Sequence, residues 1–209
     1  MKVLLVNGSS RPEGCTYTAL KEAAKILEAE GIACEIFQIG SSPIRDCIGC
    51  GKCRREPIPA CIFDDDCVNT LLQRAAEADG FIFGTPVYYA HPSGRLLSVL
   101  DRAFYAGKSV FAHKPGFAVV SARRAGTTAS LDAVTKHFTI NEMPVVSSTY
   151  WNMVHGNSPA EVLQDQEGLQ TMRNAARNLA WLLKCIEAGK QAGILPPQAE
   201  SGNRTNFIR

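Results

Sequence analysis

The sequence has no long hydrophobic run and little net charge. No apolar stretch approaches the roughly 20 residues that span a bilayer, so we expect no membrane partner. A net charge of +2, without a dense run of lysine or arginine, gives no reason to expect binding to nucleic acid. The first residues are typical of a strand rather than a signal peptide, and we therefore expect a cytoplasmic protein.

Familiar catalytic and nucleotide-binding motifs are also missing. No Ser-His-Asp pattern supports hydrolysis. The glycine-containing loop near the N-terminus lacks both the Lys-Ser/Thr ending of a triphosphate P-loop and the three-glycine dinucleotide fingerprint. Without repeats or a low-complexity linker, the 209 residues predict one domain over 1–190, with a cysteine-rich insertion at 40–67 and an irregular tail at 191–209.

Segments typical of strands and helices alternate along the chain. We expect strands at 2–7, 33–39, 80–84, 116–121 and 143–148, and helices at 16–30, 67–78, 93–104, 126–140 and 168–188. Repeated βα units predict an α/β fold, with a doubly wound parallel sheet and helices on both faces. Ligands of such sheets bind beyond the carboxyl ends of the strands.

The segment after the first strand predicts a phosphate site. Ser9, Ser10 and Thr16 offer hydroxyl groups, and Arg11 adds a positive charge. The helix that follows would present free backbone N–H groups and the positive end of its dipole, which together bind a phosphate monoester. This combination suits the single phosphate of a mononucleotide such as FMN.

Two further loops follow the third and fourth predicted strands, at 85–89 and 121–127. The first contains Pro86 and two tyrosines, which could form an aromatic wall beside a flat ring. In the second, Arg123 could stabilise negative charge on a reduced flavin. Taken singly, each loop is also compatible with an ordinary turn or a solvated loop. Their equivalent positions at one sheet edge favour a shared flavin site.

Five of the eight cysteines lie between residues 47 and 67. The spacing C-x2-C-x2-C of Cys47, Cys50 and Cys53, with Cys61 as a more distant fourth thiol, is typical of ligands of a [4Fe–4S] cluster. Cys67 is an alternative fourth ligand. Four thiolates could also bind zinc, and pairs of thiols could oxidise to disulfides.

The motifs at 7–16, 78–89 and 94–102 resemble those of the NADPH-dependent FMN reductase family, over roughly residues 1–185. The resemblance implies a flavodoxin-like, five-stranded sheet of order 2-1-3-4-5, tightly held FMN, and a homodimer or homotetramer in which a partner subunit helps cover the flavin. The residues that it assigns to FMN are Ser9, Arg11, Cys15, Thr16 and Tyr17 at the phosphate, Pro86, Val87, Tyr88 and Tyr89 along the ring, and Ser121, Arg123 and Gly126 near its far edge. Cys15 departs from the family, which often has a hydroxyl or asparagine there.

Two functions follow from this resemblance. The first is an FMN-dependent oxidoreductase that takes a hydride from NAD(P)H and passes electrons to a small-molecule acceptor such as a quinone or flavin. The second follows from the cysteine motif, which resembles that of iron-sulfur flavoproteins, where a cluster relays electrons between ferredoxin and FMN. A flavin-binding module without turnover is a third interpretation. In none of them must a side chain act as a general acid or base, because the cofactor carries the chemistry.

Overall fold

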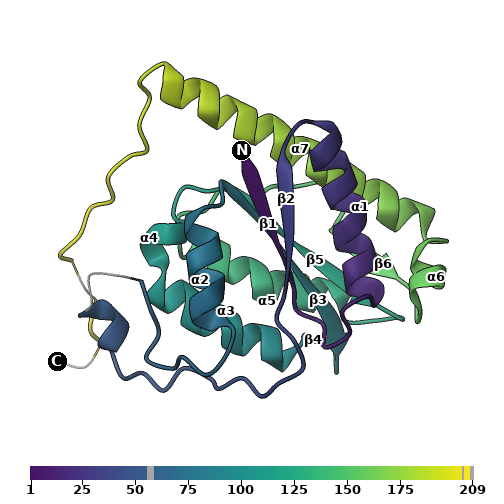
Figure 1. Ribbon diagram of the computed structural model, residues 1–209, viewed down its shortest axis with the longest axis horizontal. Helices are drawn as coiled ribbons and strands as arrows, with labels where there is room; N and C mark the ends of the chain where they lie inside the picture. The colour runs from purple at the N-terminus through teal and green to yellow at the C-terminus, as the bar shows by residue number, and fades with distance from the viewer. Residues whose placement is uncertain (56–58, 204, 208–209) are drawn as a thin grey trace.

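The computed structural model describes residues 1–55, 59–203 and 205–207. A parallel sheet lies at the centre, with strands in the order β2-β1-β3-β5-β6, and β4 pairs with β3 in the antiparallel direction (Figure 1). The strands are β1 (Lys2–Asn7), β2 (Ala33–Gln38), β3 (Gly80–Tyr88), β4 (His91–Pro92), β5 (Gly116–Ala122) and β6 (Met153–His155).

Helices cover both faces of the sheet. Figure 1 shows α1 and α7 on one side and α2, α3 and α5 on the other, and each group packs in its own hydrophobic cluster. The helices are α1 (Cys15–Ala29), α2 (Val68–Ala76), α3 (Gly94–Ala106), α4 (Lys108–Phe111), α5 (Thr127–Thr139), α6 (Pro159–Val162), α7 (Gln166–Gln191) and the 3-10 turn η1 (Lys52–Arg54).

The alternation of side chains along each strand explains why both faces need a helical layer. Val3 and Leu5 of β1 pack with α1 and α7, whereas Leu4 and Val6 pack with α2 and α3. All four side chains are fully buried. A run of consecutive buried apolar residues is typical of a strand in a parallel sheet covered on both sides, and the predicted fold class is confirmed.

The fifth parallel strand was predicted in the wrong place. The segment 143–148 forms only one isolated bridge, between Val145 and Gly116. The strand that completes the sheet is β6, which pairs with Val120, Ser121 and Ala122 of β5. With β6 in that position, the five parallel strands have the predicted order. The segment leaves the sheet because its backbone turns toward α7, where Asn178 Nδ2 donates to the carbonyl oxygen of Ser147 at 2.9 Å.

A second difference concerns 85–89, which the sequence predicts as a loop. β3 continues through these residues to Tyr88 and then turns back into β4, a sixth strand that the sequence analysis missed. Tyr89 and Ala90 form the two-residue turn, and their φ angles are +51° and +56°. Hairpin turns with two positive φ angles favour asparagine and glycine, so a Tyr-Ala pair carries no recognisable turn signal.

Replacing Ala90 with glycine should stabilise the protein. A residue with a Cβ in the left-handed region costs about 1–2 kcal/mol, and glycine avoids this cost. Part of the gain is lost, because glycine has more conformational freedom in the unfolded chain. We expect Ala90→Gly to raise the free energy of unfolding by about 0.5–1 kcal/mol, measured by urea denaturation. An unchanged or lower stability would contradict the assignment of strain to this turn.

The remaining predicted segments lie close to their observed positions, with helix ends shifted by the small amounts that such boundaries usually show. Of the predicted insertion 40–67 and tail 191–209, residues 56–58, 204, 208 and 209 lie outside the described residues. Within the described part of the insertion, η1 is the helical segment. In the same described part of the chain, no helix is long and apolar enough to span a membrane.

Candidate functional site

The three predicted loops meet at the carboxyl edge of the sheet. The N–H of Gly8 donates to the carbonyl oxygen of Gly84 at 2.8 Å, which joins the first loop to β3. The hydroxyl groups of Thr16 and Ser121 share a hydrogen bond of 2.8 Å, which joins the start of α1 to the end of β5. The sequence prediction that these segments share one edge is therefore supported by direct contacts.

Gly126 joins the third segment to the hairpin. A Cβ at this position would lie 2.3 Å from the Cα of Ala90 and 3.0 Å from Val87. Its φ angle of +92° also favours glycine. Glycine here lets the loop before α5 approach the β3–β4 hairpin more closely than any other residue would allow.

Asn7, which the sequence analysis did not select, shapes the first loop. Its side chain is buried, its Nδ2 donates to the carbonyl oxygen of Pro12 at 3.1 Å, and its Oδ1 accepts from the N–H of Ser9 at 3.2 Å. Ser9 Oγ in turn accepts from the N–H of Arg11 at 3.1 Å. The sequence signal was present, since a polar residue ended an otherwise apolar strand.

The N-terminus of α1 opens onto this loop. Gly14 caps the helix without a side-chain hydrogen bond, and the described first turn contains no acidic residue. The N–H groups of the first helical turn, at Cys15, Thr16 and Tyr17, have no partner within the helix. Arg11 lies exposed beside them, as does Ser10. Free N–H groups, the helix dipole and a nearby guanidinium together favour an anion.

Cys15 does not face the loop. Its thiol donates to the carbonyl oxygen of Gly156, beyond β6, with a separation of 3.6 Å. Burial raises the pKa of Cys15, so its sulfur stays neutral and adds no negative charge beside the helix N-terminus. Its contribution to the loop is its backbone N–H.

The predicted ring-binding residues differ in exposure. Pro86 and Val87 are half-buried on β3, whereas Tyr88 and Tyr89 are exposed, and the side chain of Tyr89 is exposed completely. In the third segment, Ser121 is buried, Gly126 is half-buried and Arg123 is exposed. The edge therefore presents two tyrosines and an arginine to solvent, while the hydroxyl-bearing Ser121 lies buried beneath them.

The four predicted cluster cysteines line one small cavity. Its volume is about 20 Å³, and its wall includes Phe63, Arg102 and Tyr105 beside Cys47, Cys50, Cys53 and Cys61. Burial raises the pKa of Cys53, and the other three thiols raise it further. Cys67, the alternative ligand, is absent from the described wall of this cavity. Among the described residues, no three His, Cys, Asp or Glu side chains already surround a common metal position.

Arg102 holds the insertion against α3, and the sequence analysis missed this role. Its side chain is 1% exposed; its Nε donates to Cys61 Sγ at 3.3 Å, and its guanidinium pairs with the buried carboxylate of Asp66. It also donates to the carbonyl oxygen of Arg45 at 3.1 Å. Burial alone would lower the pKa of Arg102, but the bonds to Asp66 and Cys61 outweigh it, so the net pKa is raised. A permanent cation beside Cys61 stabilises negative charge on that sulfur.

Comparison with known proteins supports this reading of the sheet edge. Residues 1–158 match the model of the NADPH-dependent FMN reductase family. The chain belongs to this family. The resemblance predicted from the sequence is confirmed, and so is the predicted class of function, an FMN-dependent oxidoreductase.

Curated relatives of this FMN reductase family member are named iron-sulfur flavoproteins. One, MJ1083 of Methanocaldococcus jannaschii, is 33% identical over 90% of this chain and 100% of its own length. Another, from Methanosarcina thermophila, is 25% identical over 91% of this chain and 99% of its own length. These matches extend across the cysteine insertion, in agreement with the second resemblance that the sequence predicted.

Solved structures confirm the flavodoxin-like fold. A flavone reductase superposes with a TM-score of 0.66 at 19% identity, over 90% of this chain and 64% of that one. A flavodoxin from the domain Archaea superposes with a TM-score of 0.61 at 13% identity, over 88% and 99% of the two chains. At these identities the likeness concerns the fold alone.

Proposed function

We propose that this FMN-dependent oxidoreductase holds the flavin phosphate at the N-terminus of α1 and takes electrons from NAD(P)H for a small-molecule acceptor. The observation that carries the proposal is the uncapped first turn of α1, placed beside the β3–β4 hairpin and the end of β5. An anion there would receive hydrogen bonds from N–H groups that have no partner within the helix. The residues present therefore fit a phosphate monoester.

Each segment of the edge has a distinct part in this proposal. The backbone of 15–17, with Ser9, Ser10, Arg11 and Thr16, would bind the phosphate. Pro86 and Val87, with Tyr88 and Tyr89, would position the ring, and Ser121 and Gly126 would allow the loop to approach it. Arg123 would stabilise negative charge at the pyrimidine edge. The bound flavin itself would supply hydride acceptance.

Two finer points belong to the same proposal. Tyr88 and Tyr89 are exposed at the proposed flavin edge. Exposed aromatic side chains beside a ring site support a homodimer or homotetramer in which a partner subunit covers them. We also infer a cytoplasmic location, because thiols crowded in one insertion and free in the structure are usual in reducing compartments.

Anaerobic mixing of the FMN-loaded protein with NADPH tests the electron donor. We expect the flavin absorbance maximum to bleach, and bleaching to reverse when a quinone is added. Flavin that binds but never bleaches with NADPH or NADH would reject the nicotinamide-linked reaction while leaving the flavin site intact. Protein that fails to retain FMN would reject the site itself.

The cavity lined by Cys47, Cys50, Cys53 and Cys61 favours a second candidate, electron relay through a [4Fe–4S] cluster. Four thiolates are the usual donor set for such a cluster, so the donors present fit it, with Arg102 donating to one sulfur. Bound there, the cluster would supply single-electron transfer. The curated relatives' names add support.

A groove beside the thiol cavity supports the binding of an acidic electron donor such as ferredoxin. Cys47 lines this groove as well as the thiol cavity. Phe104 and Ile140 give it an apolar lining, and Arg54, Lys108 and Lys136 place positive charge around it, with Asp101 as the carboxylate among its lining residues. Complementary charge steers such encounters and fixes their orientation.

Replacing Cys53 with serine should remove the cluster and leave the flavin. After anaerobic purification we expect about four iron atoms and four sulfides per chain in the parent protein, and a loss of most of both in Cys53→Ser. Cys185→Ser, at an exposed thiol on α7, is the matched control and should keep them. Iron absent from the parent protein, or unchanged in Cys53→Ser, would contradict cluster binding at these thiols.

A further inference from the structure

Two amide side chains at the end of the sheet hold the loop that connects β1 to α1. Asn7 and Gln38 are the last residues of β1 and β2, and the parallel register places them opposite each other. Residues in register on neighbouring strands direct their side chains to the same face of the sheet. Both amides donate to the loop 8–14, which we call the phosphate loop.

The two amides bind carbonyl oxygens of this loop. Gln38 Nε2 donates to the carbonyl oxygen of Ser9 at 2.7 Å. Asn7 Nδ2 donates to the carbonyl oxygen of Pro12 at 3.1 Å and, more weakly, to that of Arg11 at 3.5 Å. A carbonyl oxygen is the negative end of the peptide dipole and repels an anion, so a loop that binds phosphate must turn its carbonyls elsewhere. In this loop they point to the ends of β1 and β2.

Ser9 connects Gln38 to Arg11. Its carbonyl is held by Gln38 and its N–H donates to Asn7 Oδ1 at 3.2 Å, so Ser9 has little freedom to rotate. Its Oγ accepts from the N–H of Arg11 at 3.1 Å. The Arg11 side chain then lies against Gly14, the N-cap of α1, where an added Cβ would be 3.1 Å from Arg11 Cβ and 3.7 Å from Arg11 Cδ. Gln38 therefore fixes the residue that places Arg11 beside the helix N-terminus.

Stability alone does not account for a glutamine at position 38. Its Oε1 is buried and has no hydrogen-bond partner among the described residues. The amide cannot reverse to give this oxygen a bond, because the Ser9 carbonyl next to it can only accept. A buried acceptor without a partner costs free energy. An apolar side chain of similar length would avoid that cost, and what it would lack is the N–H donor to the phosphate loop.

We propose that Gln38 is a positioning residue for FMN. It keeps the Ser9 carbonyl turned away from the flavin phosphate and, through Ser9, holds Arg11 beside that phosphate. The inference rests on the proposed function, because it requires the phosphate to bind at the N-terminus of α1. Gln38 itself does not contact the flavin. Its effect is therefore specific to the phosphate, and binding of the flavin ring should not depend on it.

Riboflavin, which has the ring and ribityl chain of FMN without the phosphate, tests this role. The affinities of the flavin-free protein for FMN and riboflavin are measured by flavin fluorescence quenching, and their ratio gives the preference for the phosphate. Gln38→Met removes the donor and keeps the length of the side chain. We expect it to lower the affinity for FMN by about 10-fold, the effect of one hydrogen bond, and to leave riboflavin binding and the midpoint of urea unfolding close to those of the parent.

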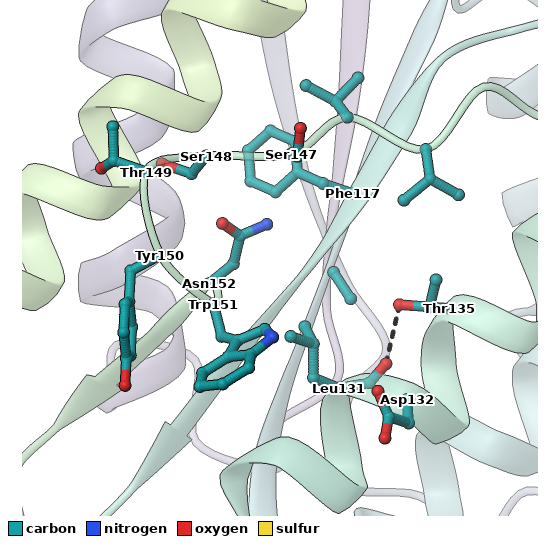
Figure 2. A pocket seen from close by; sticks show the side chains of 13 residues that line it. Phe117, Leu131, Asp132, Thr135, Ser147, Ser148, Thr149, Tyr150, Trp151 and Asn152 are labelled. Atoms are coloured by element: carbon teal, nitrogen blue, oxygen red, sulfur yellow. Dashed lines mark hydrogen bonds between the residues drawn. The ribbon is translucent and has the colours of Figure 1, made fainter.

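Asn152→Leu is the matched control. Asn152 is also a buried amide whose oxygen has no partner among the described residues, but it lines a cleft of about 420 Å³ beside β5. Figure 2 shows its side chain between the rings of Phe117 and Trp151, and none of the described residues that line this cleft belongs to the phosphate loop. Asn152→Leu should therefore keep the preference for FMN over riboflavin that the parent protein has.

The outcomes separate this inference from the proposed function. A Gln38→Met protein that prefers FMN as strongly as the parent does, or that loses equal affinity for both flavins, would overturn the role of Gln38 and leave the phosphate site intact. A parent protein that binds riboflavin as tightly as FMN would reject the phosphate site, and this inference with it. Should Gln38→Met fail to fold, Gln38→Glu, which has the shape of glutamine but no N–H, decides the question by the same ratio.

Discussion

Replacing Asp66 with alanine should destabilise the protein by about 3–5 kcal/mol, the usual cost of leaving a buried charge without its partner. The carboxylate of Asp66 and the guanidinium of Arg102 are 5% and 1% exposed, and they pair directly. Arg102 has no route to water from this position. We expect urea denaturation to show the loss, and the same variant to hold less iron, because Arg102 also contacts Cys61.

The neighbouring residue provides the control. Asp65 pairs with Arg45, but both side chains are more than half exposed, so Asp65→Ala should cost less than about 1 kcal/mol. The double variant Asp66→Leu with Arg102→Met removes both charges, and it should recover most of the stability that Asp66→Ala loses. If Asp66→Ala and Asp65→Ala have similar stabilities, the insertion is not held by this pair.

Replacing Cys15 with proline should weaken FMN binding by about 10- to 150-fold, which corresponds to one charge-assisted hydrogen bond of about 1.5–3 kcal/mol. Proline at the first helical position removes an N–H and keeps the helix, and the extended conformation of Gly14 is compatible with a following proline. The substitution therefore removes a backbone N–H that would donate to the phosphate, which a change of side chain alone cannot do. Flavin fluorescence quenching measures the affinity.

Cys15→Ala separates this effect from loss of the thiol. It removes the same hydrogen bond to Gly156 and retains the backbone N–H, so we expect FMN affinity close to that of the parent protein. Equal affinities for Cys15→Pro and Cys15→Ala would place the phosphate elsewhere. The iron content of the protein should be unaffected by either variant, since Cys15 is separate from the thiol cavity.

Local signals explain which parts of the site could be predicted. Ser9, Arg11 and Thr16 follow an apolar strand and precede an amphipathic helix, and this order alone indicates a helix N-terminus that can bind an anion. The spacing of Cys47, Cys50 and Cys53 is likewise local. Spacing could not choose between Cys61 and Cys67 as the fourth thiol, because that choice depends on how the insertion packs against α3.

The sequence by itself determined the parallel sheet with two helical layers, because β1 is apolar from Val3 to Val6, most of β3 is apolar, and the strands alternate with amphipathic helices. It also determined which loops meet at the carboxyl edge, since that follows from topology. Only the tertiary structure decided that β6 rather than 143–148 completes the sheet, and that Arg102 and Asp66 are buried together. Each of these depends on contacts between residues far apart in the chain, and local propensity carries no information about such contacts.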